Sequence, residues 1–325
     1  MKGRHRIVIE NSRIRYDFEV RRNLTIVRGD SATGKTTLVD MVGEFYNNGD
    51  VSGVRYVCDK PCAVLSGKDW ENALKVIKDS IVFIDEDNGF IASERFAAVI
   101  RETDNYYVLV TREPLPNLPY SVDEIYGIHN SGKYGTLKKT YNEFYRLYGS
   151  RELQKGVKPD RIIMEDSGSG FQFFDELCKE PCITCDSAQG KSNMFTLAAG
   201  IEEEETLLVA DAAAFGPEME RVHGLLEEKR NLALYLPESF EWLLMDAGIV
   251  TDHEIKDILK TPEDAIESSE YFSWERFFTA LLIKKTEGTY LRYNKSKLSE
   301  AYKQVRILDM VRKYLPVELK DGKKD

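Results

Sequence analysis

Two spacings of apolar residues alternate along the first 150 residues. Short apolar runs such as "LTIV" (24–27), "IVFI" (81–84) and "YYVLV" (106–110) are typical of buried strands. Stretches with helical spacing separate them, among them 34–47 and 93–103. Strands that are apolar along their whole length predict a parallel sheet covered on both faces by helices, and therefore an α/β domain over residues 1–150.

The same alternation begins again after a polar stretch. Residues 141–160 ("YNEFYRLYGSRELQKGVKPD") are interpreted as a helical connector that ends in a Gly/Pro break. A second α/β domain is predicted over 158–250, with strands at "RIIM", "CITC", "TLLV" and "LALY". Residues 251–325 show helical spacing, and we expect a C-terminal helical region with a frayed tail.

Composition and charge narrow the setting. The chain has 325 residues and a net charge of −10, which argues against a protein that coats nucleic acid through charge alone. It has no apolar stretch of 18 residues, so we expect a cytoplasmic protein without a membrane span. Its five cysteines are an odd number, and we expect them to serve core packing. Residues 1–22 are locally basic, which predicts either a basic binding face or, as the preferred reading, a solvated edge hairpin.

The stretch "GDSATGKTT" (29–37) carries the clearest chemistry. It matches G-x-x-x-x-G-K-[ST] between a predicted strand and a predicted helix, the context in which this loop cradles a nucleotide phosphate. We expect Lys35 to reach the β- and γ-phosphates and the Thr36 hydroxyl to bind Mg²⁺. The expected nucleotide-binding residues are Gly29, Ser31, Thr33, Gly34, Lys35, Thr36 and Thr37.

A strand that ends in "DE" supplies the acids that such a loop requires. We expect Asp85 to hold Mg²⁺ together with Thr36, and Glu86 to be the catalytic general base that activates water. At the next strand end, Thr111 or Arg112 is expected either to sense the γ-phosphate or to pair with Asp123 or Glu124. The missing N/T-K-x-D guanine motif favours ATP over GTP.

Acidic residues also follow the strands of the second domain. Because parallel strands present their carboxyl ends at one edge of the sheet, these acids are expected to converge into a cation site. Mg²⁺ held by carboxylates is suited to phosphodiester cleavage. N-capping of the following helices is the alternative. The candidates are Glu165 and Asp211, as metal ligands and catalytic residues, and Glu238, as a metal ligand that Glu241 follows by one turn.

Together these motifs resemble two known families. Residues 20–130 are similar to the P-loop ATPase superfamily, with Walker A at Gly29–Thr36 and Walker B at Ile81–Glu86. About 45 residues separate the motifs, too few for an ABC-type insertion, so the arrangement is closer to a minimal AAA or RecA-like core. Residues 158–250 resemble the Toprim domain of overcoming-lysogenization-defect nucleases and related phage-defence proteins. This likeness is carried by Glu165, "FQFFDEL" (171–177), "QGKSNM" (189–194) and Asp211.

The second resemblance has a departure. The second acid of the family's Asp-x-Asp motif falls on Ala213 in this chain. The resemblances imply an ATPase domain that uses ATP and Mg²⁺ to control a Toprim-like domain acting on DNA or RNA. The alternatives are a nucleotide-dependent switch that binds a partner protein or nucleic acid through a catalytically degenerate domain, and a small-molecule kinase. A homo-oligomer is also expected, because ATPases of this size often complete their site with a neighbour's arginine.

Overall fold

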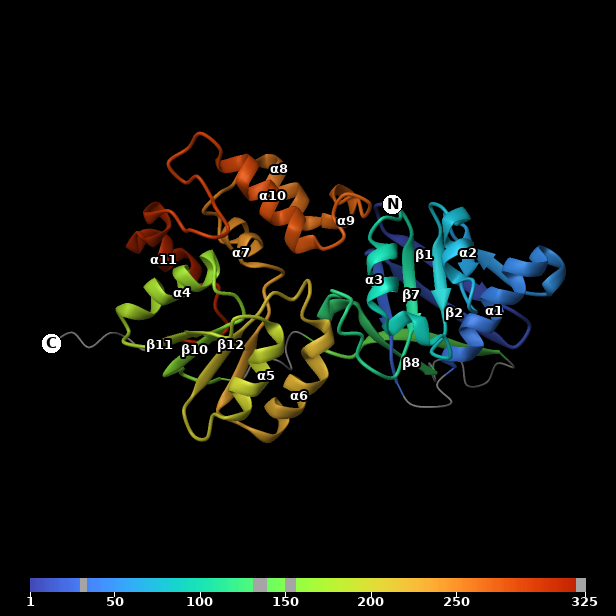
Figure 1. Cartoon of the computed structure of the whole chain (residues 1–325), viewed down its shortest axis with the longest axis horizontal. Helices are drawn as coiled ribbons and strands as arrows, with labels where there is room; N and C mark the ends of the chain where they lie inside the picture. Colours follow the sequence, from blue (N-terminus) through green and yellow to red (C-terminus); the bar gives the residue numbers. More distant parts are fainter. Residues whose placement is uncertain (30–33, 131–138, 150–155, 320–325) are drawn as a thin grey trace. The chain divides into compact units, whose positions relative to one another are not determined.

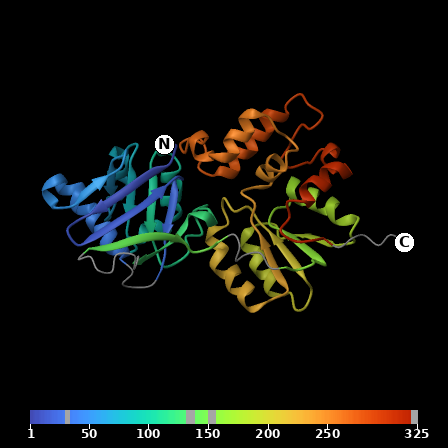
Figure 2. The same cartoon turned by 180° about the vertical axis from the view of Figure 1, so that it is seen from behind.

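The computed structural model describes residues 1–29, 34–130, 139–149 and 156–319 (Figure 1; Figure 2 shows the reverse view). The contacts within it divide the chain into two units. The first unit contains Met1–Leu147 and Thr261–Phe272, and the second contains Tyr148–Lys260 and Ser273–Asp325. The short segment 261–272 therefore packs with the first unit although the chain on both sides of it belongs to the second.

The first unit is built on a mixed sheet, nine-stranded among the described residues. Its strands β8, β3, β7, β6 and β5 are parallel, whereas β1 is antiparallel to both β2 and β4, and β9 is antiparallel to β8 and parallel to β2. Across the sheet the order is β4 (Arg55–Val57), β1 (His5–Glu10), β2 (Ile14–Val20), β9 (Thr140–Arg146), β8 (Ile125–Asn130), β3 (Leu24–Val27), β7 (Tyr106–Val110), β6 (Ile81–Ile84) and β5 (Cys62–Val64).

Helices bury both faces of the parallel part. Helix α1 (Lys35–Asn48) packs Leu38 and Val42 into a core that includes Val108 of β7. Phe96 of α3 (Glu94–Ile100) meets Tyr107 of the same strand edge to face, with 6.1 Å between the ring centroids. Since successive side chains of a strand point to opposite faces, β7 is covered on both sides, as its uninterrupted apolar run predicts. Helix α2 (Trp70–Val76) completes the unit together with the single-turn helices Gly49–Ser52, Gly89–Ala92 and Val122–Glu124.

Two expectations for this unit are wrong. The first half of the predicted helical connector forms strand β9, in which Phe144 stacks on Phe18 at 4.1 Å between ring centroids. The sheet is consequently mixed and not parallel. The basic N-terminal hairpin is also not at the edge of the sheet, because β4 lies outside β1.

The second unit contains a parallel four-stranded sheet in the order β11 (Thr184–Ser187), β10 (Arg161–Met164), β12 (Thr206–Val209) and β13 (Leu232–Tyr235). Helix α4 (Ser169–Lys179) lies over one face, and α5 (Lys191–Ala199) and α6 (Met219–Glu228) lie over the other (Figure 1). The chain leaves β10 toward β11 and later returns to β12 on the opposite side of β10. The carboxyl ends of β10 and β12 therefore form a topological switch point, the usual ligand position in such sheets.

The C-terminal part of this unit is helical, as expected. Helix α7 (Phe240–Asp246) packs against α10 (Trp274–Thr286), and α11 (Val305–Arg312) packs beside α4. The remaining helices are α8 (His253–Lys260), the single-turn helices Gly216–Glu218 and Glu300–Lys303, and, in the first unit, α9 (Pro262–Ala265). None of the helices in the described part of the chain has the length and apolar character needed to cross a bilayer.

Candidate functional site

The loop between β3 and α1 begins and ends with glycines in the left-handed region. Gly29 has φ of 135° and Gly34 has φ of 91°, backbone conformations that favour glycine. A Cβ atom on Gly34 would lie 2.8 Å from Oη of Tyr16, whose hydroxyl donates to the Gly34 carbonyl at 2.7 Å. Tyr16 thus fixes the end of the loop from strand β2. Burial raises the pKa of Tyr16 to about 12, which keeps its hydroxyl a donor.

The first turn of α1 brings the phosphate-binding residues together with the acid of β6. Lys35 is buried, with 5% of its surface exposed. Its Nζ donates to the Gly29 carbonyl, at the start of the loop, at 2.6 Å. The Thr36 side chain lies near the carboxylate of Asp85 and opposes the rise that burial causes in the pKa of that group. Thr37 follows on the same turn and is half-buried. The expected binding residues Ser31 and Thr33 lie outside the described residues.

The acids at the end of β6 have distinct surroundings. Burial raises the pKa of Asp85, and the N–H of Glu86, which donates to Asp85 at 2.7 Å, opposes this shift. Glu86 forms a two-pronged ion pair with Arg112, whose Nη2 lies 2.7 Å from Oε1 of Glu86. Arg112 follows β7, so the carboxyl ends of neighbouring strands supply both partners.

The expected pairing of Thr111 or Arg112 with Asp123 or Glu124 is wrong. The Thr111 hydroxyl donates to the Glu113 carbonyl at 2.8 Å. Asp123 instead pairs with Arg146, and Glu124 pairs with Arg21 and Arg22. The Arg112 guanidinium is thereby directed at Glu86, beside the phosphate loop.

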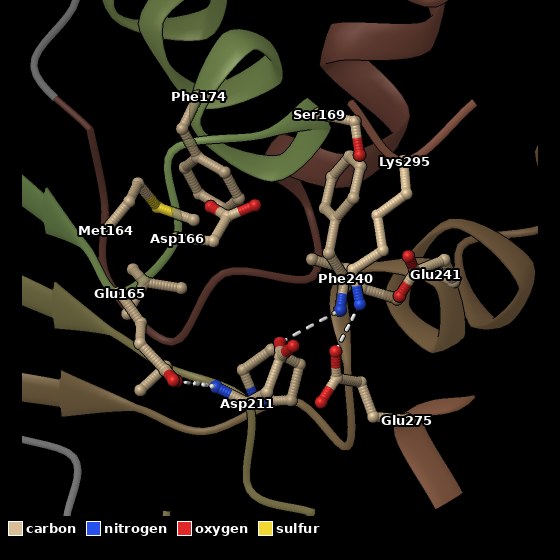
Figure 3. Close-up of a pocket in the computed structure, with 14 residues that line it drawn as sticks. Met164, Glu165, Asp166, Ser169, Phe174, Asp211, Phe240, Glu241, Glu275 and Lys295 are labelled. Carbon is tan, nitrogen blue, oxygen red and sulfur yellow. Dashed lines mark hydrogen bonds and ion pairs between the residues drawn. The ribbon is translucent and has the colours of Figure 1, made fainter. Parts of the chain in front are cut away.

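The second unit has a cavity of about 80 Å³ at its topological switch point (Figure 3). Glu165 follows β10 and Asp211 follows β12, so the two strands of the switch point each contribute one acid. Among the described residues that line the cavity, the charged ones are Glu165, Asp166, Asp211, Glu241, Glu275 and Lys295. Five carboxylates therefore face one cationic side chain.

Backbone N–H groups hold three of these acids in place. Oε2 of Glu165 accepts from the N–H of Asp211 at 3.1 Å, and Oδ1 of Asp211 accepts from the N–H of Phe240 at 3.1 Å (Figure 3). Asp166 accepts from the N–H of Phe171 at 3.0 Å, as well as from the preceding turn, and so caps α4. The capping alternative thus describes Asp166, and Asp211 likewise accepts from the first residue of a helix, α7 (Phe240–Asp246). Glu165 instead ties the end of β10 to the end of β12.

Burial and crowding favour the protonated forms of these acids. Burial raises the pKa of Glu165 to about 7, with Glu275 adding to the shift and Lys191 opposing it. Burial raises the pKa of Asp211 well above its usual value, and the charges of Glu275 and Glu165 reinforce this. Two like charges in a poorly hydrated cavity disfavour each other's ionisation, so a cation bound here would be stabilised by the same groups.

Two further acids of the cavity come from the helices. Glu241 on α7 is 2% exposed and accepts from the Tyr293 hydroxyl at 2.8 Å. Glu275 on α10 pairs with Nζ of Lys295. Glu275 had no signal in the sequence, because its helix was recognised only by its aromatic spacing. Glu241 was visible as the acid one turn after Glu238.

Glu238 and Ala213 are placed differently from the lining acids. Glu238 is not among the residues that line the cavity, and its backbone carbonyl accepts from the N–H of Ala213 at 3.2 Å. Ala213 is 3% exposed, so its methyl group is packed against its surroundings. The structure thus brings Glu165 and Asp211 to one cavity, and Glu241 and Glu275 lie there in place of Glu238.

The described residues contain no group of three or more His, Cys, Asp or Glu side chains arranged to hold a metal ion. The acids of the cavity are therefore neighbours without preformed coordination geometry. All five cysteines are free thiols. Cys62 and Cys178 are buried, as expected for core packing, whereas Cys182 is exposed and Cys58 and Cys185 are half-buried, so the expectation is wrong for these three.

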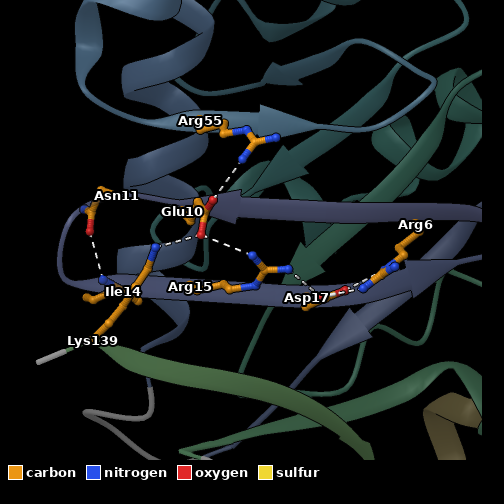
Figure 4. A network of polar contacts seen from close by, with 8 residues as sticks. All are labelled: Arg6, Glu10, Asn11, Ile14, Arg15, Asp17, Arg55 and Lys139. Atoms are coloured by element: carbon orange, nitrogen blue, oxygen red, sulfur yellow. Dashed lines mark hydrogen bonds and ion pairs between the residues drawn. The ribbon is translucent and has the colours of Figure 1, made fainter. Parts of the chain in front are cut away.

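The basic N-terminal stretch takes part in an ion-pair network of the first unit (Figure 4). Glu10 contacts Lys139 at 2.7 Å, Arg15 at 3.2 Å and Arg55 at 3.5 Å. Asp17 pairs with both Arg6 and Arg15. Each acid engages more than one cation, so both acids of the network are paired, while the four cations outnumber the two acids.

No known protein-family model matches the chain, and no curated protein matches it.

Proposed function

We propose that the first unit binds and hydrolyses ATP with Mg²⁺. The observation that carries this proposal is the placement of Thr36 and Asp85: Thr36 lies in the first turn of α1, after the glycine-bounded loop, and Asp85 directly follows β6, which β7 separates from β3 in the sheet. Thr36 also lies near enough to Asp85 to oppose the rise in the pKa of that carboxyl. A hydroxyl and a carboxylate near one another after a glycine-rich loop are the two protein ligands that Mg²⁺ takes in nucleotide sites of this kind.

Each residue of the site has a role that follows from its position. Gly29 and Gly34 let the backbone turn around the phosphates at the N-terminus of α1, and Lys35 exchanges its bond to the Gly29 carbonyl for phosphate oxygens. Mg²⁺, when bound, neutralises phosphate charge. Glu86 accepts the proton of the attacking water, and Arg112 orients this carboxylate. The acid at the position of Glu86 favours hydrolysis over the small-molecule kinase alternative.

Phosphate release by purified full-length protein tests this proposal. We expect Lys35→Ala to weaken nucleotide binding and lower hydrolysis by about 100-fold or more, and Glu86→Gln to lower hydrolysis by about 100-fold while ATP still binds. The exposed Lys68→Ala is the matched control and should behave as the wild type. Wild-type rates in Lys35→Ala would contradict the assignment of the loop, and ADP formation that requires a small acceptor would support the kinase.

We further propose that the second unit acts on nucleic acid through a divalent cation at Glu165 and Asp211. The position of both acids at the switch point of a parallel sheet supports this proposal, as does their shared cavity. A cation there would polarise a phosphoryl oxygen and activate water. The buried methyl group of Ala213 favours the alternative, a nucleotide-controlled unit that binds nucleic acid or protein without cleaving it.

Strand cleavage separates these alternatives. Plasmid, single-stranded DNA and RNA are incubated with ATP and either Mg²⁺ or Mn²⁺, and strand breaks are followed on gels. We expect Asp211→Asn to abolish cleavage and Asp175→Asn, whose side chain is half exposed on α4, to retain it. Cleavage that persists in Asp211→Asn would disprove the metal-nuclease proposal. Nucleic-acid binding without strand breaks in the wild type would establish the non-cleaving alternative.

A further inference from the structure

Residues 261–272, here called the strap, connect the two units in an unusual way. The chain leaves the second unit after Lys260, packs with the first unit along the strap, and re-enters the second unit at Ser273. Only two residues further on, Glu275 lines the carboxylate cavity. The strap therefore belongs structurally to the nucleotide-binding unit while its end is covalently joined to a wall of the other unit's cavity.

The start of the strap is fixed by buried polar contacts to the N-terminus of the chain. Glu263 is 3% exposed and accepts from Nε of Arg4 at 3.1 Å. The Glu263 carbonyl accepts from the N–H of Gly3 at 2.7 Å, and the Met1 carbonyl accepts from the N–H of Ser268 at 3.0 Å. Backbone hydrogen bonds and an ion pair between buried Glu263 and half-exposed Arg4 hold this segment as part of the first unit.

The end of the strap contacts the strand that leads into the phosphate loop. Nδ2 of Asn23 donates to the Phe272 carbonyl at 2.7 Å, and the Arg101 guanidinium lies 5.9 Å from the centroid of the Phe272 ring. Asn23 immediately precedes β3, and the Asn23 carbonyl accepts from the N–H of Tyr107 on β7. Strand β3 runs directly from this contact to Gly29.

The segment that follows the strap is equally well fixed in the second unit. Trp274 is buried and begins α10, and Glu275 pairs with Lys295. The carbonyl of Lys295 accepts from the N–H of Ser169, at the start of α4, at 2.9 Å. Phe272 is thus only three residues from Glu275, a carboxylate whose charge contributes to the raised pKa values of Asp211 and Glu165.

We propose that the strap couples the two sites: nucleotide binding at the loop after β3 shifts the Asn23–Phe272 contact and thereby repositions Glu275 and its partner Lys295 in the carboxylate cavity. This inference rests on the proposed nucleotide binding by the first unit. It specifies how the second site is regulated, because a movement of Glu275 changes the negative charge in the cavity and the mobility of the Lys295 side chain that pairs with it. Coupling of two sites requires an element whose arrangement both sites bias, and the strap with the first turn of α10 is that element.

Hydrogen exchange of the full-length protein, with and without a non-hydrolysable ATP analogue and Mg²⁺, tests the coupling. We expect the analogue to slow exchange in α1 and to change exchange in residues 274–286 by about fivefold or more, the lower end of typical coupling between sites. If α1 is protected while residues 274–286 are unchanged, the coupling is disproved and nucleotide binding stands. If α1 is not protected, the proposed nucleotide site itself fails.

Substitutions then test the route. Asn23→Ala removes the bond to Phe272, and we expect α1 to remain protected while the response of residues 274–286 is largely lost. Asn117→Ala removes an equivalent bond in the same unit, from Nδ2 to the Ala92 carbonyl at 2.8 Å, and should keep the full response. A full response in Asn23→Ala would disprove the route. Glu263→Gln provides a second break in the strap, with the exposed Glu270→Gln as its control.

Discussion

Two groups of carboxylates in this protein have opposite electrostatic surroundings. In the ion-pair network of the first unit, Glu10 and Asp17 each engage more than one cation, and hydrogen bonds from Lys139 and Arg6 lead the lowering of their pKa values. In the cavity of the second unit, burial raises the pKa values of Glu165 and Asp211, and Lys295 is the one cationic side chain among the described lining residues. The first group is electrostatically complete, whereas the second lacks positive charge.

The difference separates a structural role from a binding role. An exposed, fully paired network contributes modestly to stability and has little left to offer a ligand. Buried carboxylates without enough cations cost stability, and such a cost is typical of sites where charge is arranged for a ligand. The cavity therefore has the charge deficit that a cation or a cationic group would satisfy, which supports the function proposed for Glu165 and Asp211.

The strongest test of this contrast is the pH dependence of stability. Because the pKa of Glu165 is raised in the folded state, the unfolded chain loses this proton at a lower pH than the folded protein does. The stability therefore falls as the pH rises from the unfolded-state pKa of about 4.5 to the folded-state pKa of about 7. For Glu165 this amounts to at most about 3 kcal/mol. We expect Asp211→Asn to recover about 1–3 kcal/mol at about pH 8 and little at about pH 5, because it removes a buried repulsive charge and keeps the acceptor for Phe240.

Urea unfolding at the two pH values in EDTA measures this effect, with Asp175→Asn as the control. Added Mg²⁺ or Mn²⁺ should stabilise the wild type more at the higher pH and should have little effect on Asp211→Asn. A variant that is less stable than the wild type at the higher pH would show that the carboxylate of Asp211 is a favourable structural group, and the contrast between the two regions would fail.

The residues that meet at the first site could be predicted from local sequence rules, whereas those of the second site could be predicted only in part. Thr36 and Asp85 belong to a loop motif and a strand end whose meeting is implied by parallel topology. The same rule placed Glu165 and Asp211 at one edge of a sheet. Glu275 could not be found in this way, because it lies more than 60 residues after Asp211 on a helix whose spacing showed only aromatic packing. The contact of Tyr16 with the Gly34 carbonyl could not be predicted in this way either, because it joins residues 18 positions apart in the chain.

Strand β9 was wrongly predicted to be a helix because its aromatic residues also fit the spacing of a helix. Tyr141, Phe144, Tyr145 and Tyr148 follow the i, i+3, i+4, i+7 spacing of a helix. The segment is nevertheless extended, because pairing with β2 and β8 satisfies its backbone on both sides and stacks Phe144 on Phe18. The pairing with β2 depends on a strand more than 100 residues away, and tertiary contacts of this kind override local spacing.

A smaller effect is expected at the lysine of the cavity. Lys295→Met leaves Glu275 without its ion pair and increases the negative charge near Asp211, so we expect a loss of about 1 kcal/mol at about pH 8, since the side chain of Lys295 is half exposed and partly screened. The loss should shrink toward about pH 5, where Glu165 is protonated. The exposed Lys297→Met is the control. Urea unfolding measures both, and an equal loss at both pH values would indicate lost packing instead of lost charge.

The smallest effect is expected in the paired network, and its sign with pH is opposite. Glu10→Gln removes the acid that joins Lys139, Arg15 and Arg55, and we expect a loss of about 0.5 kcal/mol at low salt and neutral pH. Because the pKa of Glu10 is lowered in the folded state, this contribution is present above the pKa of the unfolded state and disappears as pH falls below about 4.

The contribution of Glu10 should also vanish in about 1 M salt, where charges are screened within about 3 Å. Thermal unfolding at low and high salt, with the exposed Glu44→Gln as control, measures it. A loss that survives high salt would mean that Glu10 acts through packing, and the network would then resemble the cavity more than its exposure suggests.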